Sequence, residues 1–151
     1  KFTNVECQST NLSWVLIHQC RLKAINRNRV DFNLNSTILY PVRSLRVHTQ
    51  LLKKANGYKP WLIDVEIDVC LFLKKHNHPF IKIVYDIFAS SSNINHTCPY
   101  VGPIIVTDLH LKPDSIPLPL PTGDYCLIIK WKFDRKIQAL NKFYFEYMED
   151  P

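Results

Sequence analysis

The sequence has little of what catalysis or phosphate binding commonly requires. It holds three glycines in 151 residues, with no Gly-x-Ser-x-Gly motif, no glycine-rich phosphate loop and no paired-carboxylate signature. His76 and His78 share a short polar loop, and His96 lies two residues before Cys98, but neither pair has an evident neighbour to complete a metal site or activate a nucleophile. The sequence therefore predicts a protein that is not an enzyme and carries no metal or cofactor.

Long apolar runs are also absent. No segment approaches the roughly 20 apolar residues that a membrane-spanning helix needs, and the chain begins at Lys1 instead of Met. We therefore expect a removed leader and a chain that does not span a membrane. The net charge is +6, but the basic residues are scattered, so we expect no binding to nucleic acid. A basic surface for anionic lipid headgroups or an acidic receptor patch stays open.

What the chain does have is five cysteines and three acceptor triplets for N-linked glycans. No two cysteines form a C-x-x-C pair, which argues against a zinc ribbon or a thioredoxin-like redox site. The triplets begin at Asn11, Asn35 and Asn95, and the third is followed at once by Cys98. Together these features predict a secreted, extracellular glycoprotein.

Apolar and polar residues alternate along most of the chain, which is typical of β-strands with one wet face. From Trp61 to Leu73 every odd position is apolar, whereas Asp64, Glu66 and Asp68 occupy even positions. In another strand the solvent-facing side carries residues such as Asp31 and Asn35. We predict strands at about residues 2–8, 14–25, 30–40, 43–54, 61–73, 103–112, 125–133 and 143–147.

One segment follows a helical period instead. From Pro79 to Ala89 the apolar residues recur at helical spacing, and Pro79 suits a first helical turn. The proline-rich stretch Pro113 to Gly123 is predicted to be a surface connector, with capping of a core or pocket as the alternative. With no repeat or linker, residues 1–151 are predicted to be one domain: an all-β, antiparallel, immunoglobulin-like sandwich of about eight strands, with one short helix on a crossover.

The predicted helix suggests how the cysteines pair. A bridge between Cys70 and Cys98 would tie the helical excursion to the strand before it, and a bridge between Cys7 and Cys20 would join the first two strands. Cys126 is out of phase with the apolar positions of its strand, so we expect a free thiol that faces away from the core and reacts with an alkylating agent in the folded protein.

Several ordered blocks of the sequence carry a resemblance that covers nearly the whole chain: Phe2 to Cys7, Cys20 to Arg27, Leu51 to Pro60, Ser92 to Tyr100 and Pro119 to Tyr125. In these blocks the chain resembles the insect chemosensory-B (CheB-like) secreted proteins. That family is distantly similar to the ML lipid-recognition domains and the ganglioside activator protein, which are sandwiches that hold an apolar ligand between splayed sheets. The resemblance covers four of the cysteines but not Cys126. Since ML domains often join an early cysteine to a late one, it also leaves a Cys7–Cys126 bridge open.

The resemblance implies a secreted carrier or co-receptor in chemosensation, binding a pheromone-like lipid or hydrocarbon. The alternative is a cavity-free secreted module that modulates a membrane receptor or channel through its surface. Bulky apolar side chains that face one interior by phase fill a core or line a cavity. For the cavity we predict the helix to cover one end of the space between the sheets. The predicted lining residues are Trp61, Ile63, Phe80, Val84, Ile87, Phe88, Tyr125, Leu127, Ile129, Trp131, Phe143 and Phe145.

Overall fold

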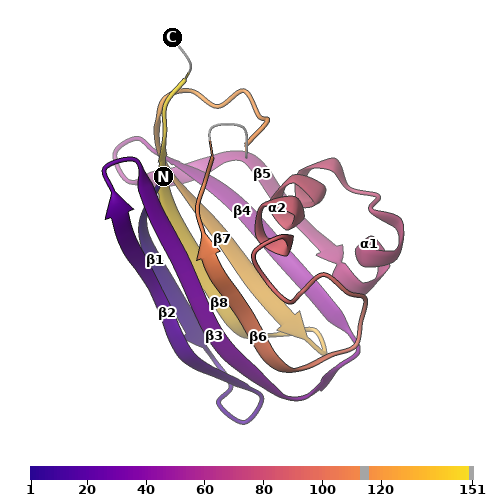
Figure 1. Ribbon diagram of the computed structural model, residues 1–151. Helices are drawn as coiled ribbons and strands as arrows, with labels where there is room; N and C mark the ends of the chain where they lie inside the picture. Colours follow the sequence, from indigo (N-terminus) through magenta and orange to yellow (C-terminus); the bar gives the residue numbers. More distant parts are fainter. Residues whose placement is uncertain (113–115, 150–151) are drawn as a thin grey trace.

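The alternating segments form strands, as the computed structural model in Figure 1 shows for the residues it describes, 1–112 and 116–149. The β-branched and aromatic residues that dominate these segments suit a pleated surface with one buried face. The strands are β1 (Phe2–Ser9), β2 (Val15–Asn26), β3 (Arg29–Val42), β4 (Leu45–Lys54), β5 (Tyr58–Asp68), β6 (Tyr100–Leu109), β7 (Gly123–Phe133) and β8 (Lys136–Tyr147).

The strands form two layers. A five-stranded sheet has the order β1-β8-β7-β4-β5, and a three-stranded sheet has the order β2-β3-β6. Every pair of neighbours is antiparallel. The core lies between the layers, where the inward side chains of both sheets meet, among them Phe32 of β3, Val47 of β4 and Phe143 of β8. The predicted all-β antiparallel sandwich is confirmed.

Two helices follow β5, where the sequence predicted one. Helix α2 (Pro79–Ala89) has the predicted bounds. Helix α1 (Val69–Lys75) occupies the end of the segment that was predicted to continue as a strand, and that part of the prediction is wrong. The strand ends because the Asp68 side chain accepts a hydrogen bond from the Leu71 backbone N–H at 3.0 Å and so caps a helix.

Two disulfides tie these elements together. Cys7–Cys20 joins β1 to β2, the edge strands of the two sheets, and Cys70–Cys98 joins α1 to the segment before β6. Both pairs are those expected from the sequence. In Figure 1, α1 and α2 lie beside β5, at the edge of the sandwich away from β1. Within the described residues, no helix is long and apolar enough to cross a membrane.

Cys126 is the free cysteine of the described residues and is buried, not open to solvent. It faces away from the inter-sheet core, but the Tyr144 side chain lies beside it, and Tyr144 packs against Tyr58 with ring centroids 5.4 Å apart. Burial raises the pKa of the thiol, which further lowers its reactivity. The cysteine is free, as expected from the sequence, and its burial disfavours the expected alkylation of the folded protein, which stays a prediction.

Candidate functional site: an apolar cavity between the sheets

A cavity of about 190 Å³ lies between the two sheets. Its walls come from β2, β3 and β6 of the smaller sheet, from β4, β5, β7 and β8 of the larger sheet, and from both helices. No Asp, Glu, Lys or Arg side chain of the described residues lines it. A space with this lining favours a neutral, apolar molecule over a charged one.

A second, smaller cavity of about 50 Å³ adjoins the first. The two share Val84 and Phe88 of α2 and Phe143 of β8 as lining residues. The rings of Phe88 and Phe143 are in contact, with centroids 5.1 Å apart. Helix α2 therefore stands at the boundary between the two spaces, and a shift of Phe88 would join them.

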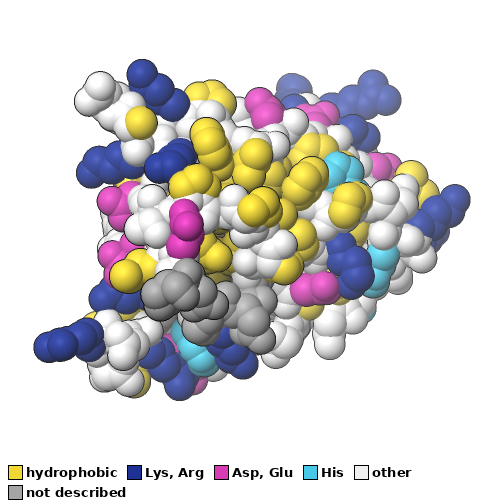
Figure 2. Space-filling view, turned by 90° about the horizontal axis from the view of Figure 1, so that it is seen from above, with side chains coloured by type: hydrophobic (Ala, Val, Ile, Leu, Met, Phe, Trp, Pro, Cys, Tyr) yellow, Lys and Arg dark blue, Asp and Glu magenta, His cyan; other side chains and the backbone are white. Residues whose placement is uncertain are grey.

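The smaller cavity points toward one end of the sandwich. Its lining includes Phe2 at the start of β1 and Ile116, Leu118 and Leu120 of the connector before β7. Figure 2 views this end from above and shows hydrophobic side chains gathered across the middle of the face. The described part of the predicted connector, residues 116–123, thus contributes to the wall of a pocket, while residues 113–115 lie outside the described residues.

Nine of the twelve predicted lining residues border one of the cavities. Val84, Phe88, Ile129, Trp131 and Phe143 border the larger one. The smaller one is bordered by Val84, Phe88 and Phe143 again, together with Ile63, Ile87, Leu127 and Phe145.

Three predicted lining residues, Trp61, Phe80 and Tyr125, border neither cavity. Trp61 is exposed because β5 is irregular beside it: Leu62 has a left-handed backbone with φ of 52°, which breaks the alternation. Phe80, in the first turn of α2, is also exposed. Tyr125 is fully buried, stacks on Phe145 and donates a hydrogen bond to the Pro121 carbonyl at 2.6 Å, so it fills the core.

Most polar side chains on the cavity wall already have partners. Ser36 donates to the Ile104 carbonyl at 3.0 Å, and the Tyr100 hydroxyl lies 2.9 Å from the Ile94 carbonyl oxygen. Asn141 accepts from Trp131 Nε1 at 2.7 Å. Burial raises the pKa of Tyr100 to about 12, so this hydroxyl is neutral at physiological pH. The wall is uncharged, with a few fixed dipoles.

Thr49 also lines the larger cavity, and the sequence analysis did not single it out. It lies between Val47 and Leu51 on the inward side of β4, where the alternation places buried residues. The sequence therefore held a signal for this residue, namely a threonine at a position that the alternation of β4 directs toward the interior.

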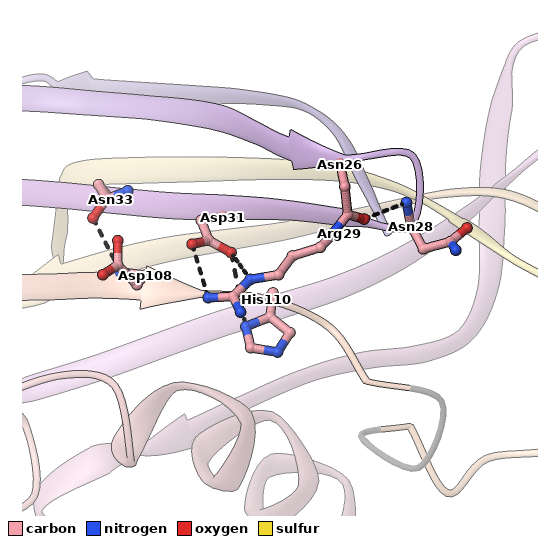
Figure 3. Close-up of polar contacts among 7 residues, drawn as sticks. All are labelled: Asn26, Asn28, Arg29, Asp31, Asn33, Asp108 and His110. Carbon is pink, nitrogen blue, oxygen red and sulfur yellow. Dashed lines mark hydrogen bonds and ion pairs between the residues drawn. The ribbon is translucent and has the colours of Figure 1, made fainter.

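A charged cluster around the buried Asp31 lies outside the cavity (Figure 3). Asp31 of β3 was predicted to be solvent-facing but is buried, because Arg29 and His110 cover it. Arg29 donates two hydrogen bonds to the carboxylate, at 2.7 and 3.1 Å. These bonds lower the pKa of Asp31. His110 Nδ1 lies 3.8 Å from the same carboxylate.

The glycan acceptors lie at the surface in two of three cases. Asn35 and Asn95 are exposed, whereas Asn11 is partly buried and its side chain accepts a hydrogen bond from the Ser13 N–H at 3.1 Å. The described residues hold no group of three or more His, Cys, Asp or Glu side chains that could bind a metal ion.

Comparison with models of protein families places part of the chain in a known family. A model described as "Protein of unknown function (DUF1091)" matches residues 47–127, which is more than half of the chain. The matched region runs from β4 into β7 and includes both helices. This family is known as ML-like, which agrees with the broader part of the resemblance seen in the sequence. No curated protein matches the chain.

Proposed function

We propose that this chain, which belongs to the DUF1091 family, is a non-enzymatic carrier or co-receptor that encloses a hydrophobic molecule between its sheets. The observation that carries the proposal is the uncharged cavity lined by both sheets and by α2. Burying apolar ligand surface in such a space is favourable without directional chemistry. The resemblance to the insect chemosensory-B proteins supports a lipid-like or hydrocarbon cue, such as a pheromone, as the ligand.

The size of the cavity limits what fits without movement. At about 190 Å³ it is smaller than the roughly 300–1,000 Å³ of common ligand pockets. Micromolar binding of an alkyl chain takes about fifteen buried methylenes at about 0.8 kcal/mol each, because several kcal/mol offset the lost freedom of the ligand. We therefore expect a long-chain ligand to widen the cavity and to join it to the smaller one.

Helix α2 is the element best suited to make this room. Its Val84 and Phe88 border both cavities, and as a helix it is not part of a sheet ladder. A shift of α2 breaks no hydrogen bonds between strands, whereas a shift of β4 or β7 would break two ladders. In this proposal α2 gates the cavity, and the Cys70–Cys98 bridge limits how far the helical segment moves.

The test is to fill the space beside α2. Val84→Trp places an indole at the boundary of the two cavities and is expected to abolish uptake of a fluorescent long-chain fatty acid or hydrocarbon. Lys82→Trp is the matched control, because Lys82 is exposed on the same helix and borders neither cavity. Circular dichroism checks that both variants fold. If wild type takes up no apolar probe, or if folded Val84→Trp binds it as well as Lys82→Trp does, the cavity is not the binding site. The surface-interaction alternative then takes its place.

We further propose that the protein acts outside the cell. Two disulfides and the exposed acceptors Asn35 and Asn95 support this location. Native mass spectrometry of protein secreted from insect cells, followed by solvent extraction, measures glycan mass and bound lipid in one sample. Unglycosylated protein that fails to leave the cells would contradict the location.

A further inference from the structure

The hydroxyl of Thr49 has no partner, although the residue is deeply buried. Thr49 is 1% exposed and lines the larger cavity. It sits in the middle of β4, with Val65 of β5 on one side and Ile129 of β7 on the other. Its hydroxyl forms no hydrogen bond with any residue that the structure describes. Among the described residues, the fully buried side-chain atom without a partner is His110 Nδ1, so the unpaired Thr49 hydroxyl is not fully enclosed by protein atoms and belongs to the cavity wall.

The other hydroxyls and amides on the wall differ from Thr49 in this respect. Ser36, Tyr100 and Asn141 are hydrogen-bonded to protein groups. Tyr85 has no bonded partner among the described residues either, but it is only partly buried on α2. Thr49 alone in this set combines near-complete burial with an unused hydroxyl.

Valine would fill the same volume at this position without the unpaired group. It has the same branched shape as threonine and favours strands equally well. An unpaired buried hydroxyl costs free energy that valine avoids. A hydrogen-bonding partner within the cavity would account for threonine in place of valine at this position.

We propose that Thr49 is a hydrogen-bonding anchor for one oxygen atom of an otherwise apolar ligand. The inference rests on the proposed function and names the ligand class: a neutral long-chain alcohol, ketone or ester, in preference to a plain hydrocarbon or an ionised fatty acid. A carboxylate is disfavoured because no Lys or Arg lines the cavity. The nearest polar residue in the same cross-strand row is Asn141, two strands away or about 10 Å, and its amide is already bonded.

The test compares two probes of equal chain length, tridecane and 2-tridecanone, in wild type, Thr49→Val and Thr49→Ser. Each probe competes with the fluorescent compound N-phenyl-1-naphthylamine, and the measured quantity is the ratio of the two dissociation constants. Because the ratio is taken within one protein, it is insensitive to a general change in cavity size. We expect the preference for the ketone, measured by this ratio, to be about tenfold lower in Thr49→Val than in wild type, which corresponds to about 1.4 kcal/mol. Thr49→Ser keeps a hydroxyl and is expected to keep the preference.

The outcomes separate this inference from the function on which it rests. If the ratio of the two dissociation constants is the same in wild type and in Thr49→Val, the hydroxyl is not a ligand anchor, although the cavity still binds both probes. If wild type binds neither probe, the proposed function itself fails. Thr49→Ala provides a second hydroxyl-free variant if Thr49→Val does not fold, and an unchanged ratio in Thr49→Ala overturns the inference equally.

Discussion

Asp31 and Thr49 are both almost completely buried, at 2% and 1% exposed, yet the fold treats them in opposite ways. The Asp31 carboxylate receives two hydrogen bonds from Arg29 and has His110 beside it. The Thr49 hydroxyl forms no hydrogen bond with the described residues. The carboxylate lies outside the cavity, and the hydroxyl lies on its wall.

The difference shows where stability and function meet in this molecule. A buried carboxylate without a partner would cost several kcal/mol, so a fold that buries one must supply its partners. An unpaired hydroxyl costs about 1–3 kcal/mol, which a domain of this size can carry. Outside the cavity the protein pairs the Asp31 carboxylate, although His110 Nδ1 beside it has no hydrogen bond among the described residues, whereas on the cavity wall it leaves the Thr49 hydroxyl unpaired.

The largest effect is expected from removing the partner of Asp31. Arg29→Met keeps the length of the side chain but leaves the buried carboxylate without its two hydrogen bonds. We expect the unfolding temperature to fall on the order of 5 °C, less than for a fully buried pair because the Arg29 side chain is 41% exposed.

Lys82→Met serves as the control for this change. Lys82 pairs with Asp86 across one helical turn at an exposed position, and the loss of that pair is expected to shift the unfolding temperature by less than about 1 °C. Thermal unfolding followed by circular dichroism measures both variants. Equal shifts for the two would mean that Asp31 does not depend on Arg29.

A smaller effect on the free energy of unfolding is expected from removing the hydroxyls of the cavity wall, and its sign differs between Ser36 and Thr49. Ser36→Ala removes the donor to the Ile104 carbonyl and is expected to lower the free energy of unfolding by about 1 kcal/mol. Thr49→Val removes a hydroxyl that has no described partner and is expected to raise the free energy of unfolding by about 1 kcal/mol. Urea denaturation measures both. A loss of stability in both variants would show that the Thr49 hydroxyl contributes to the folded state.

The smallest effect on stability is expected from a change of pH at Asp31. This residue is one of 13 acidic side chains, so its titration is a small part of the total. Arg29 lowers the pKa of Asp31 in the folded state, so the fold favours the charged form. The resulting stability is fully present above the unfolded pKa of about 3.9 and is lost as the pH falls through the lower, folded value. The part of the stability difference between wild type and Asp31→Asn that comes from Arg29 should therefore shrink as the pH falls below about 4. A difference that grows in acid would reverse the sign of this argument.

The strands and α2 were predictable because their signals are local. Alternation and helical spacing can be read from about ten neighbouring residues, and both strand content and the bounds of α2 followed from them. Helix α1 was missed because Val69 and Leu73 fit the odd positions of a strand and also the spacing of a helix. The capping side chain of Asp68 was the signal that distinguished the two.

The errors at Asp31 and Trp61 have causes that the alternation does not contain. Asp31 is on the outward side of β3, as predicted, but His110, far away in the sequence, packs over it. Trp61 lost its inward direction through the left-handed backbone of Leu62. Thr49, in contrast, was accessible to the same phase argument that placed Val47 and Leu51 in the core.

The cavity also has a consequence for the volume of the protein. A cavity of 190 Å³ corresponds to about 110 mL per mole of space, and the part of that space that water does not fill contributes to the volume change that drives unfolding under hydrostatic pressure. The ligand-free form should for this reason be unusually compressible and sensitive to pressure. A molecule that fills the void removes that sensitivity, so the midpoint of pressure unfolding reports occupancy of the cavity without any label on the ligand.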